Sequence, residues 1–200
     1  MGYTRKALAT RARILDSAAN LMFAKGFSRT KLLKVLTSAR VQKGNFYYYF
    51  ASKDELGLTV LNERGEKLVT EWLGSVIERT RDPWVNIQQL AGSIIDSVVH
   101  PESPSNPVVI LALEQSEMEG EFRLAIGKVL SGVIDAFTTE IERLKKGGRL
   151  PAGVDAHRYG QMLFCLIEGA IMHHQSVRDI ANLRATVETG MECISQRFVG

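Results

Sequence analysis

The sequence predicts an all-α protein in which a three-helix helix-turn-helix domain precedes a larger helical domain. Three observations support this prediction. Apolar residues recur at spacings of three and four along most of the chain, and no stretch shows the alternation typical of strands. Two short helical segments near the N-terminus are separated by a turn of only three residues. The charge is divided, since residues 1–53 carry eleven Lys and Arg against one acid, Asp16, whereas residues 54–200 carry 14 basic and 21 acidic residues.

The division of charge bears on the kind of partner. A basic segment of net charge +10 joined to an acidic one of −7 is typical of a nucleic-acid-binding domain attached to a non-binding one. A basic surface that is merely solvated gives the same pattern, so charge alone does not decide. Apolar residues at 45% predict a globular protein with a substantial core. No apolar run reaches the roughly 18 residues of a membrane span and no secretory segment is evident, so we expect a cytoplasmic location.

The sequence shows no motif of an enzyme or a metal site. Cys165 and Cys193 lie within apolar helical patterns, far from any metal-ligand spacing, so we expect buried, reduced thiols. No nucleophile elbow, phosphate loop or zinc-hydrolase motif occurs. We therefore expect no catalytic residues, no cofactor and no metal.

The N-terminal domain is expected to contain three helices, in about residues 10–25, 31–38 and 42–50. Gly26 ends the first of them. The second and third are separated only by residues 39–41, which is the helix-turn-helix outline. The apolar stripes that predict the first two helices consist of Ile14, Leu15, Ala18, Leu21 and Met22, and of Leu32, Val35 and Leu36.

The fourth helix has a clear start, because Ser52 and Glu55 have the spacing of a capping box, and it is expected to run to about residue 79. Asp82 and Pro83 begin the next helix, since proline is welcome at the first helical position. Three prolines in residues 100–107 predict a loop. The further helices are expected in about residues 83–99, 108–115, 121–146, 156–177 and 180–198.

The third helix has two sides of different chemistry. Phe46 and Phe50 are four residues apart and can pin one side to the core, which leaves Gly44, Tyr47 and Tyr48 on the opposite side. A glycine inside a helix costs about 1 kcal/mol relative to alanine, and a DNA phosphate that approaches closely would explain it. A glycine used for helix packing is the alternative. Tyrosine hydroxyls suit phosphate oxygens, and a nine-residue helix cannot bury all its sides.

Lys53 is an independent indication of phosphate binding. A cation in the first turn of a helix opposes the helix dipole, at a cost of roughly 0.3 to 1 kcal/mol when it is exposed. A helix N-terminus together with a lysine makes a good phosphate clamp. We favour this interpretation over a solvated lysine.

Residues 14–58 resemble the DNA-binding signature of the TetR-type (tetracycline-repressor-like) regulators. The resemblance is carried by Gly26 and Phe27, Thr30, Ala39, Val41, residues 43–50 and residues 52–56. It implies that the helix starting near Gln42 enters the major groove. Arg40 stands where the family often has a turn glycine, and Tyr49 where it often has histidine. The DNA-contacting residues implied are Thr30, Lys31, Gln42, Lys43, Gly44, Asn45, Tyr47, Tyr48 and Lys53.

Beyond residue 58 the resemblance is one of layout. It implies a helical domain that dimerises through its last two long helices and binds a small ligand between the others. Apolar stripes on those two helices, which a lone chain would leave partly exposed, predict a four-helix interface. The interface is expected to contain Met162, Leu163, Leu166, Ala170, Leu183, Val187, Met191 and Ile194. The ligand is expected among Leu111, Met118, Phe122, Phe164, Cys165 and Glu168.

These inferences combine into one functional hypothesis. We expect a DNA-binding domain in residues 1–52 and a ligand-binding, dimerising domain in residues 53–200. The homodimer would repress transcription on a palindromic operator in double-stranded DNA until a small-molecule inducer releases it. The alternatives are a transcriptional activator, a ligand-independent DNA-binding protein and a helical enzyme. An enzyme needs a catalytic constellation, which is absent, and a ligand-independent protein does not need so large a second domain.

Overall fold

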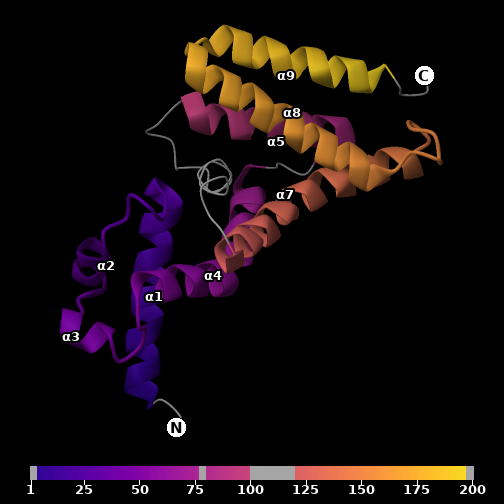
Figure 1. The fold of residues 1–200 in the computed structure, drawn as a ribbon. Helices are drawn as coiled ribbons and strands as arrows, with labels where there is room; N and C mark the ends of the chain where they lie inside the picture. The colour runs from indigo at the N-terminus through magenta and orange to yellow at the C-terminus, as the bar shows by residue number, and fades with distance from the viewer. Residues whose placement is uncertain (1–3, 77–79, 100–119, 197–200) are drawn as a thin grey trace.

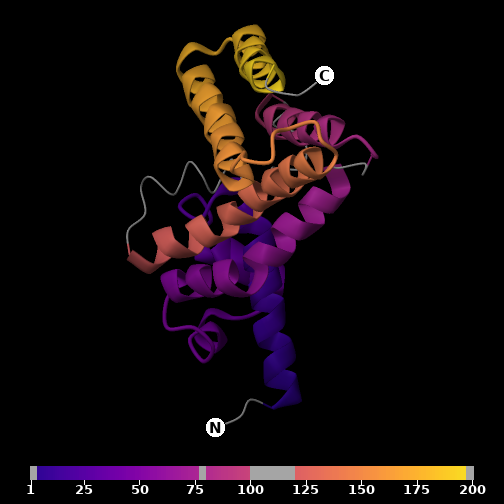
Figure 2. The same cartoon turned by 90° about the vertical axis from the view of Figure 1, so that its right-hand side faces the viewer.

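A computed structural model describes residues 4–76, 80–99 and 120–196. These residues form helices and contain no strand, which confirms the predicted fold class. The three N-terminal helices lie at one end of the molecule and the C-terminal helices at the other (Figures 1 and 2). We refer to the first group as the head (α1, α2 and α3) and to the second as the body (α5, α7, α8 and α9). Helix α4 connects them.

The head contains the helix-turn-helix. Helix α1 begins earlier than predicted, because the Thr4 side chain caps it and accepts a hydrogen bond from the Ala7 backbone N–H at 3.3 Å. Helix α3 is shorter than predicted. The backbone N–H of Tyr49 bonds to the carbonyl of Phe46 at 2.9 Å, a contact three residues back that turns the chain out of the helix. The head helices are α1 (Arg5–Lys25), α2 (Leu32–Ala39) and α3 (Lys43–Phe46).

The turn between α2 and α3 keeps its shape without glycine. Arg40 has φ 54° and ψ 48°, in the left-handed region that favours glycine. The backbone N–H of Val41 donates to the carbonyl of Leu36 at 2.9 Å, which closes the end of α2. Arg40 therefore adopts the conformation that a turn glycine would adopt.

Helix α4 (Lys53–Val76) begins at the expected capping box. The Ser52 hydroxyl accepts from the Glu55 backbone N–H at 3.0 Å, while the Glu55 carboxylate accepts from the backbone N–H of Ala51 at 2.6 Å, one residue before Ser52. Two ion pairs then tie α4 to α1: Arg11 with Glu63 at 2.6 Å and Arg64 with Asp16 at 3.0 Å. The first half of α4 is thus fixed to the head.

The second half of α4 enters the body, where α7 crosses the other helices (Figure 1). Helix α7 packs against α4, α5 and α8, and α9 packs on α8 and α5. The body helices are α5 (Pro83–Val99), α7 (Gly120–Lys146), α8 (Ala156–Val177) and α9 (Ile180–Ser195). The loop expected in 100–107 and the helix expected in 108–115 lie outside the described residues. No helix in the described ranges combines the length and apolarity needed to cross a membrane.

A buried amide joins the start of α5 to α7. Asn86 is fully buried, and its side-chain oxygen accepts from the backbone N–H and the hydroxyl of Thr80 at 3.0 and 2.9 Å. Its side-chain NH₂ donates to the Glu140 carboxylate at 3.0 Å, which also accepts from Arg143. The amide therefore fixes the chain before α5 against α7.

Candidate DNA-binding and ligand-binding sites

The two sides of the α3 segment differ as predicted. Phe46 and Phe50 are 0% and 2% exposed and pack in the core of the head. Tyr47 and Tyr48 are 52% and 63% exposed. The residues that precede them on the exposed side are Gln42, Lys43, Gly44 and Asn45. The segment therefore presents one continuous polar and aromatic surface to solvent.

Gly44 does not pack against another part of the described chain. A Cβ atom built at this position would have no described atom within 4 Å. The packing alternative for this glycine has no support here. The open space is what a closely approaching phosphate backbone requires, and the DNA contact itself stays a prediction.

Thr30 is not placed to touch DNA through its side chain. The residue is 3% exposed, and its hydroxyl donates to the carbonyls of Gly26 at 2.7 Å and Leu21 at 3.2 Å. The hydroxyl thus satisfies carbonyls at the end of α1, a structural role that the sequence pattern does not reveal. A contact between Thr30 and DNA stays a prediction, and it would not use the buried hydroxyl in this conformation. The neighbouring Lys31 is exposed.

Lys53 is half-buried and already has a partner within the head. Its ammonium donates to the carbonyl oxygen of Phe27 at 2.8 Å and lies 4.1 Å from the centre of the Phe27 ring. These contacts offset the unfavourable helix dipole at this position. The interpretation as a plain solvated lysine does not fit this geometry, whereas the predicted phosphate contact is not tested by it.

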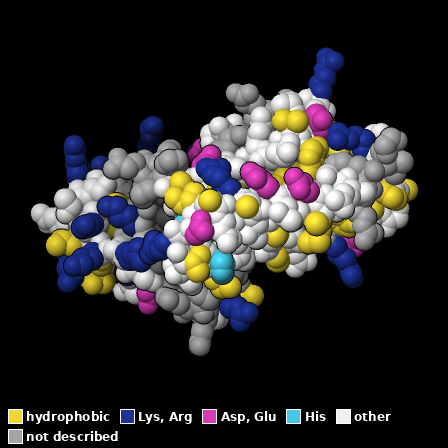
Figure 3. Space-filling model, turned by 90° about the horizontal axis from the view of Figure 1, so that it is seen from above, with side chains coloured by type: hydrophobic (Ala, Val, Ile, Leu, Met, Phe, Trp, Pro, Cys, Tyr) yellow, Lys and Arg dark blue, Asp and Glu magenta, His cyan; other side chains and the backbone are white. Residues whose placement is uncertain are grey.

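The distribution of charge follows the division into head and body. Seen from above, Lys and Arg side chains gather at the head end of the molecule, whereas most acidic side chains in that view lie over the body (Figure 3). The head end of the molecule is therefore basic in this view, as expected of a domain that meets the phosphates of DNA.

The apolar stripes predicted to form a dimer interface are used within one chain. The prediction that a lone chain leaves these residues partly exposed was wrong for most of them, because α8 packs on α7 and α5, and α9 packs on α8 and α5, within one chain. The residues buried in this way are Leu163, Ala170, Leu183, Val187, Met191 and Ile194. Of the predicted set, Leu166 is half-buried and Met162 remains 44% exposed.

A different side of α8 is apolar and uncovered. Met162, Cys165, Gly169 and Met172 follow one another at spacings of three, four and three, which places them on one side of the helix. All four are exposed, Met172 to 67%. Beside them, a hollow of about 330 Å³ opens between α8 and α9. We call this surface, with Leu166 and Cys193, the outer α8–α9 face.

Both cysteines are free thiols, as expected, but they are exposed rather than buried. The prediction of burial was wrong because Cys165 and Cys193 lie on the sides of α8 and α9 that face away from the body's core. An apolar helical pattern shows that a helix has a covered side, and it does not show that every apolar residue lies on that side.

The predicted ligand residues do not gather in one place. Leu111 and Met118 lie outside the described residues. Phe122 packs on Phe27 with ring centres 4.9 Å apart, at the junction of body and head, and Cys165 points outward. Phe164 is half-buried against the core of the body. The predicted grouping was therefore wrong for Phe122 and Cys165.

Glu168 is the member of the predicted ligand set with the most unusual environment. One of its carboxylate oxygens is inaccessible to solvent and has no hydrogen-bond partner within the described chain. Burial raises the pKa of the Glu168 carboxyl to about 7. A buried acceptor without a partner is costly, which makes this atom a candidate to receive a ligand's donor group.

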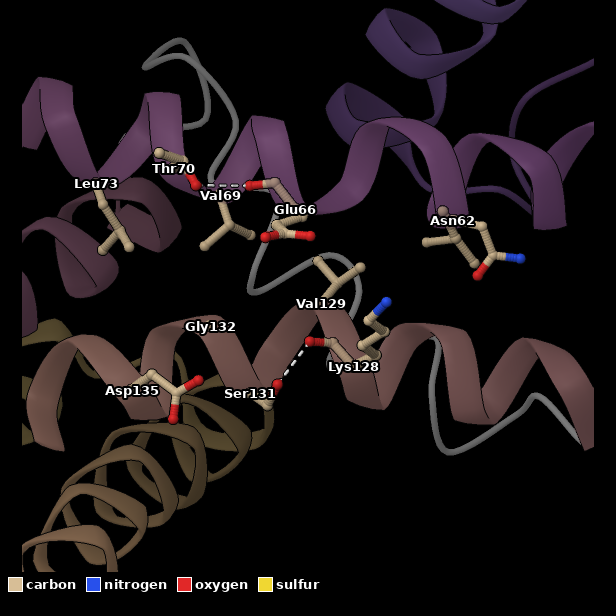
Figure 4. A pocket seen from close by; sticks show the side chains of 11 residues that line it. Asn62, Glu66, Val69, Thr70, Leu73, Lys128, Val129, Ser131, Gly132 and Asp135 are labelled. Atoms are coloured by element: carbon tan, nitrogen blue, oxygen red, sulfur yellow. Dashed lines mark hydrogen bonds between the residues drawn. The ribbon is translucent and has the colours of Figure 1, made fainter.

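A cleft of about 300 Å³ lies along the packed helices α4 and α7 (Figure 4). Its floor contains Leu61, Val69, Leu73 and Val129. Glu66, Lys128 and Asp135 bring charged side chains to its rim. Sequence reasoning missed this cleft, because polar residues at helical spacing on α4 are equally typical of a solvated helix side. The other lining residues are Asn62, Thr70, Ser131 and Gly132.

Together, the fold and the exposed α3 surface define a helix-turn-helix DNA-binding protein with a separate helical body. Within the described residues no group of His, Cys, Asp and Glu has the arrangement of a metal site. Residues 14–60 match the family described as bacterial regulatory proteins, tetR family. Residues 83–189 match the family described as the C-terminal domain of LmrA/YxaF-like transcriptional regulators. The chain belongs to the TetR family of bacterial regulatory proteins, and it is a transcriptional regulator rather than an enzyme.

Named relatives agree with this assignment. The chain is 27% identical over 164 residues to the HTH-type transcriptional repressor NemR of Escherichia coli, which covers 80% of this chain and 81% of NemR. An uncharacterised HTH-type regulator of Lactococcus lactis is 27% identical over 123 residues, 61% of this chain and 63% of that protein. A TetR-family regulator from Cytophaga hutchinsonii has the same fold, with a TM-score of 0.74, 18% identity and full coverage of both chains.

Proposed function

We propose that the chain is a homodimeric repressor that binds a near-palindromic operator through its heads and releases it when a small molecule binds its body. The observation that carries the proposal is the α3 segment, where Phe46 and Phe50 are buried while Lys43, Tyr47 and Tyr48 face solvent beside the open space at Gly44. The name of the relative NemR, a transcriptional repressor, supports repression over activation.

The proposed DNA contacts are the exposed residues of the head together with Lys53, and they omit the Thr30 side chain. Residues 1–52 form the DNA-binding domain in this proposal and residues 53–200 the ligand-binding and dimerising domain. The ion pairs of Arg11 with Glu63 and of Arg64 with Asp16 support movement of the head together with the first half of α4. The contacting set is Lys31, Gln42, Lys43, Gly44, Asn45, Tyr47, Tyr48 and Lys53.

A second copy of the chain is the proposed occupant of the outer α8–α9 face. Met162 and Met172 expose much of their surface there, and the hollow beside them has room for side chains of a partner. A two-fold dimer presents two identical α3 segments to two half-sites, which is how helix-turn-helix proteins bind palindromic operators. The interface therefore lies on the opposite side of α8 from the buried stripe at Leu163.

The effector is proposed to bind the body at one of two features. One is the unpartnered oxygen of Glu168, which would accept a hydrogen bond from the ligand. The other is the cleft between α4 and α7, where a ligand would contact the helix that carries the head. A ligand releases DNA only if it binds one arrangement of the heads better than the other.

Two measurements test this function. Selection of bound duplexes from a random pool should return half-sites related by two-fold symmetry. A selected sequence without such symmetry would contradict binding as a two-fold dimer. A screen of metabolites by thermal shift should find a compound that also releases the selected duplex. A ligand at 100 times its dissociation constant stabilises the folded state by about 2.7 kcal/mol. Glu168→Gln and Ser131→Trp, which fills the cleft, then show which feature binds the compound.

A further inference from the structure

Three segments of the chain meet at the ring of Phe27. Phe27 lies between α1 and α2, and Phe122 lies at the start of α7 with its ring centre 4.9 Å from that of Phe27. Gly57 of α4 lies under both rings. A Cβ atom at Gly57 would lie 2.4 Å from Cε2 of Phe27 and 3.1 Å from Cζ of Phe122. The missing side chain therefore allows the two rings to rest on α4.

Lys53 lies one turn earlier on the same helix and is held by the same ring. Its Nζ donates to the Phe27 carbonyl oxygen at 2.8 Å and lies 4.1 Å from the ring centre. An ammonium has three N–H donors, so two remain after this bond. Lysine loses much rotamer freedom when it is fixed, and a side chain that is already held loses less on binding a phosphate.

We propose that Phe27 is a positioning residue for operator binding: resting on Gly57 and held by Phe122 of the body, it fixes the Lys53 ammonium where its remaining donors meet a DNA phosphate. The proposal rests on the phosphate contact of Lys53 proposed above. This arrangement connects the body directly to a DNA contact, because Phe122 lies in the first turn of α7, the helix that crosses the body. A change in the body that moves Phe122 releases Phe27 and loosens Lys53.

Two other roles of Phe27 predict different results. If the ring only fills the head's core, its loss acts on stability, and any effect on DNA binding is the same with or without Lys53. If Phe27 holds Lys53 away from DNA, loosening the ring strengthens binding. Only the positioning role predicts that loss of the ring weakens operator binding when Lys53 is present and has no further effect when Lys53 is absent.

Gly57→Ala, which adds a single methyl group beside the Phe27 ring, tests the proposal. The added Cβ displaces the Phe27 ring from its place beside Lys53, and we expect operator affinity to fall about two- to fivefold, the factor that corresponds to an exposed cation–π contact. Gly74→Ala is the matched control on the same helix, since a Cβ there has no described atom within 4 Å. It gives the same increase in helix propensity and should leave affinity unchanged. Equal or tighter binding by Gly57→Ala would overturn the proposal.

Phe27→Leu provides a second test that does not depend on how Gly57→Ala folds. It keeps the backbone carbonyl and removes the ring, so a similar loss is expected, with a smaller loss of the same sign for Phe122→Leu. In a Lys53→Met background neither change should weaken binding further. Losses of equal size in both backgrounds would show a structural role and overturn the positioning role.

Lys53→Met by itself separates this inference from the proposed phosphate contact. If Lys53 contacts a phosphate, the slope of log affinity against log salt becomes shallower by about 0.9. An unchanged slope would remove the phosphate contact and the positioning role together. A shallower slope with no effect of Gly57→Ala and Phe27→Leu would keep the contact and remove only the role of Phe27.

Discussion

Glu168→Gln should make the chain more stable, and increasingly so as the pH rises. Burial raises the pKa of the Glu168 carboxyl from 4.5 to about 7 in the folded state. Below about pH 4.5 the group is protonated in both folded and unfolded chains, so it has no effect there. Between 4.5 and 7 the unfolded chain loses its proton first, and the folded state is progressively disfavoured. Well above pH 7 the cost levels off at about 3.4 kcal/mol, since each of the roughly 2.5 pKa units corresponds to about 1.36 kcal/mol.

The two-state relation places most of this cost between pH 5 and pH 8. Ionisation of Glu168 costs the folded state about 0.8 kcal/mol at pH 5 and about 3.4 kcal/mol at pH 8. Glutamine has nearly the same shape and does not ionise, so the difference in unfolding free energy between variant and parent should grow by about 2.5 kcal/mol over this range.

Urea unfolding at the two pH values, at one fixed protein concentration, measures this difference. Glu188→Gln, which changes an exposed carboxylate on α9, is the control and should show no such growth. A constant difference between Glu168→Gln and the parent from pH 5 to pH 8 would refute the reasoning, because it would mean that the carboxylate is solvated or paired in the folded protein.

The remaining predictions concern the turn, the buried amide, the outer α8–α9 face and the DNA-facing glycine. Arg40→Gly should raise the unfolding free energy by about 0.5 to 1 kcal/mol, because φ 54° costs a side chain more than glycine's added freedom in the unfolded chain; a decrease would contradict the strained turn. Asn86→Leu should lower the unfolding free energy by about 2 to 4 kcal/mol, since it removes the bonds to Thr80 and Glu140 and leaves the Thr80 backbone N–H without the Asn86 acceptor, and calorimetry checks this. Met162→Glu combined with Met172→Glu should give folded monomers in analytical ultracentrifugation, and a stable dimer would place the interface elsewhere. Gly44→Leu should leave unfolding unchanged but abolish operator binding in a gel-shift assay, and retained binding would remove the close approach at Gly44.

Local signals predicted the ends of several helices well. The helices at 83–99 and 156–177 have the predicted bounds, because Pro83 and the capping Asp155 act within one turn. The third helix was predicted too long. Phe46 and Phe50 keep helical spacing, but the backbone N–H groups of Tyr48 and Tyr49 bond three residues back, in a tighter turn that apolar periodicity does not register.

Contacts between distant segments were the part that the sequence did not predict. Apolar stripes at Leu163 and Val187 showed correctly that α8 and α9 each have a covered side, but not which other helices of the same chain cover them. Phe122 was expected beside Phe164, and it packs on Phe27, 95 residues away along the chain. No local pattern specifies which of two apolar neighbours a side chain will meet, since burial is non-directional.

The exposed α3 surface is proposed to bind the operator. The operator affinities of Lys43→Ala and Lys67→Ala, measured side by side, test this most directly. Both changes remove one exposed lysine, but Lys43 lies on the proposed DNA-facing surface, whereas Lys67 lies farther along α4, where it pairs with Glu71. At physiological salt Lys43→Ala should weaken operator binding and reduce the preference for operator over random DNA, while Lys67→Ala should bind like the parent. Full operator affinity of Lys43→Ala, or an equal loss for both variants, would contradict the account.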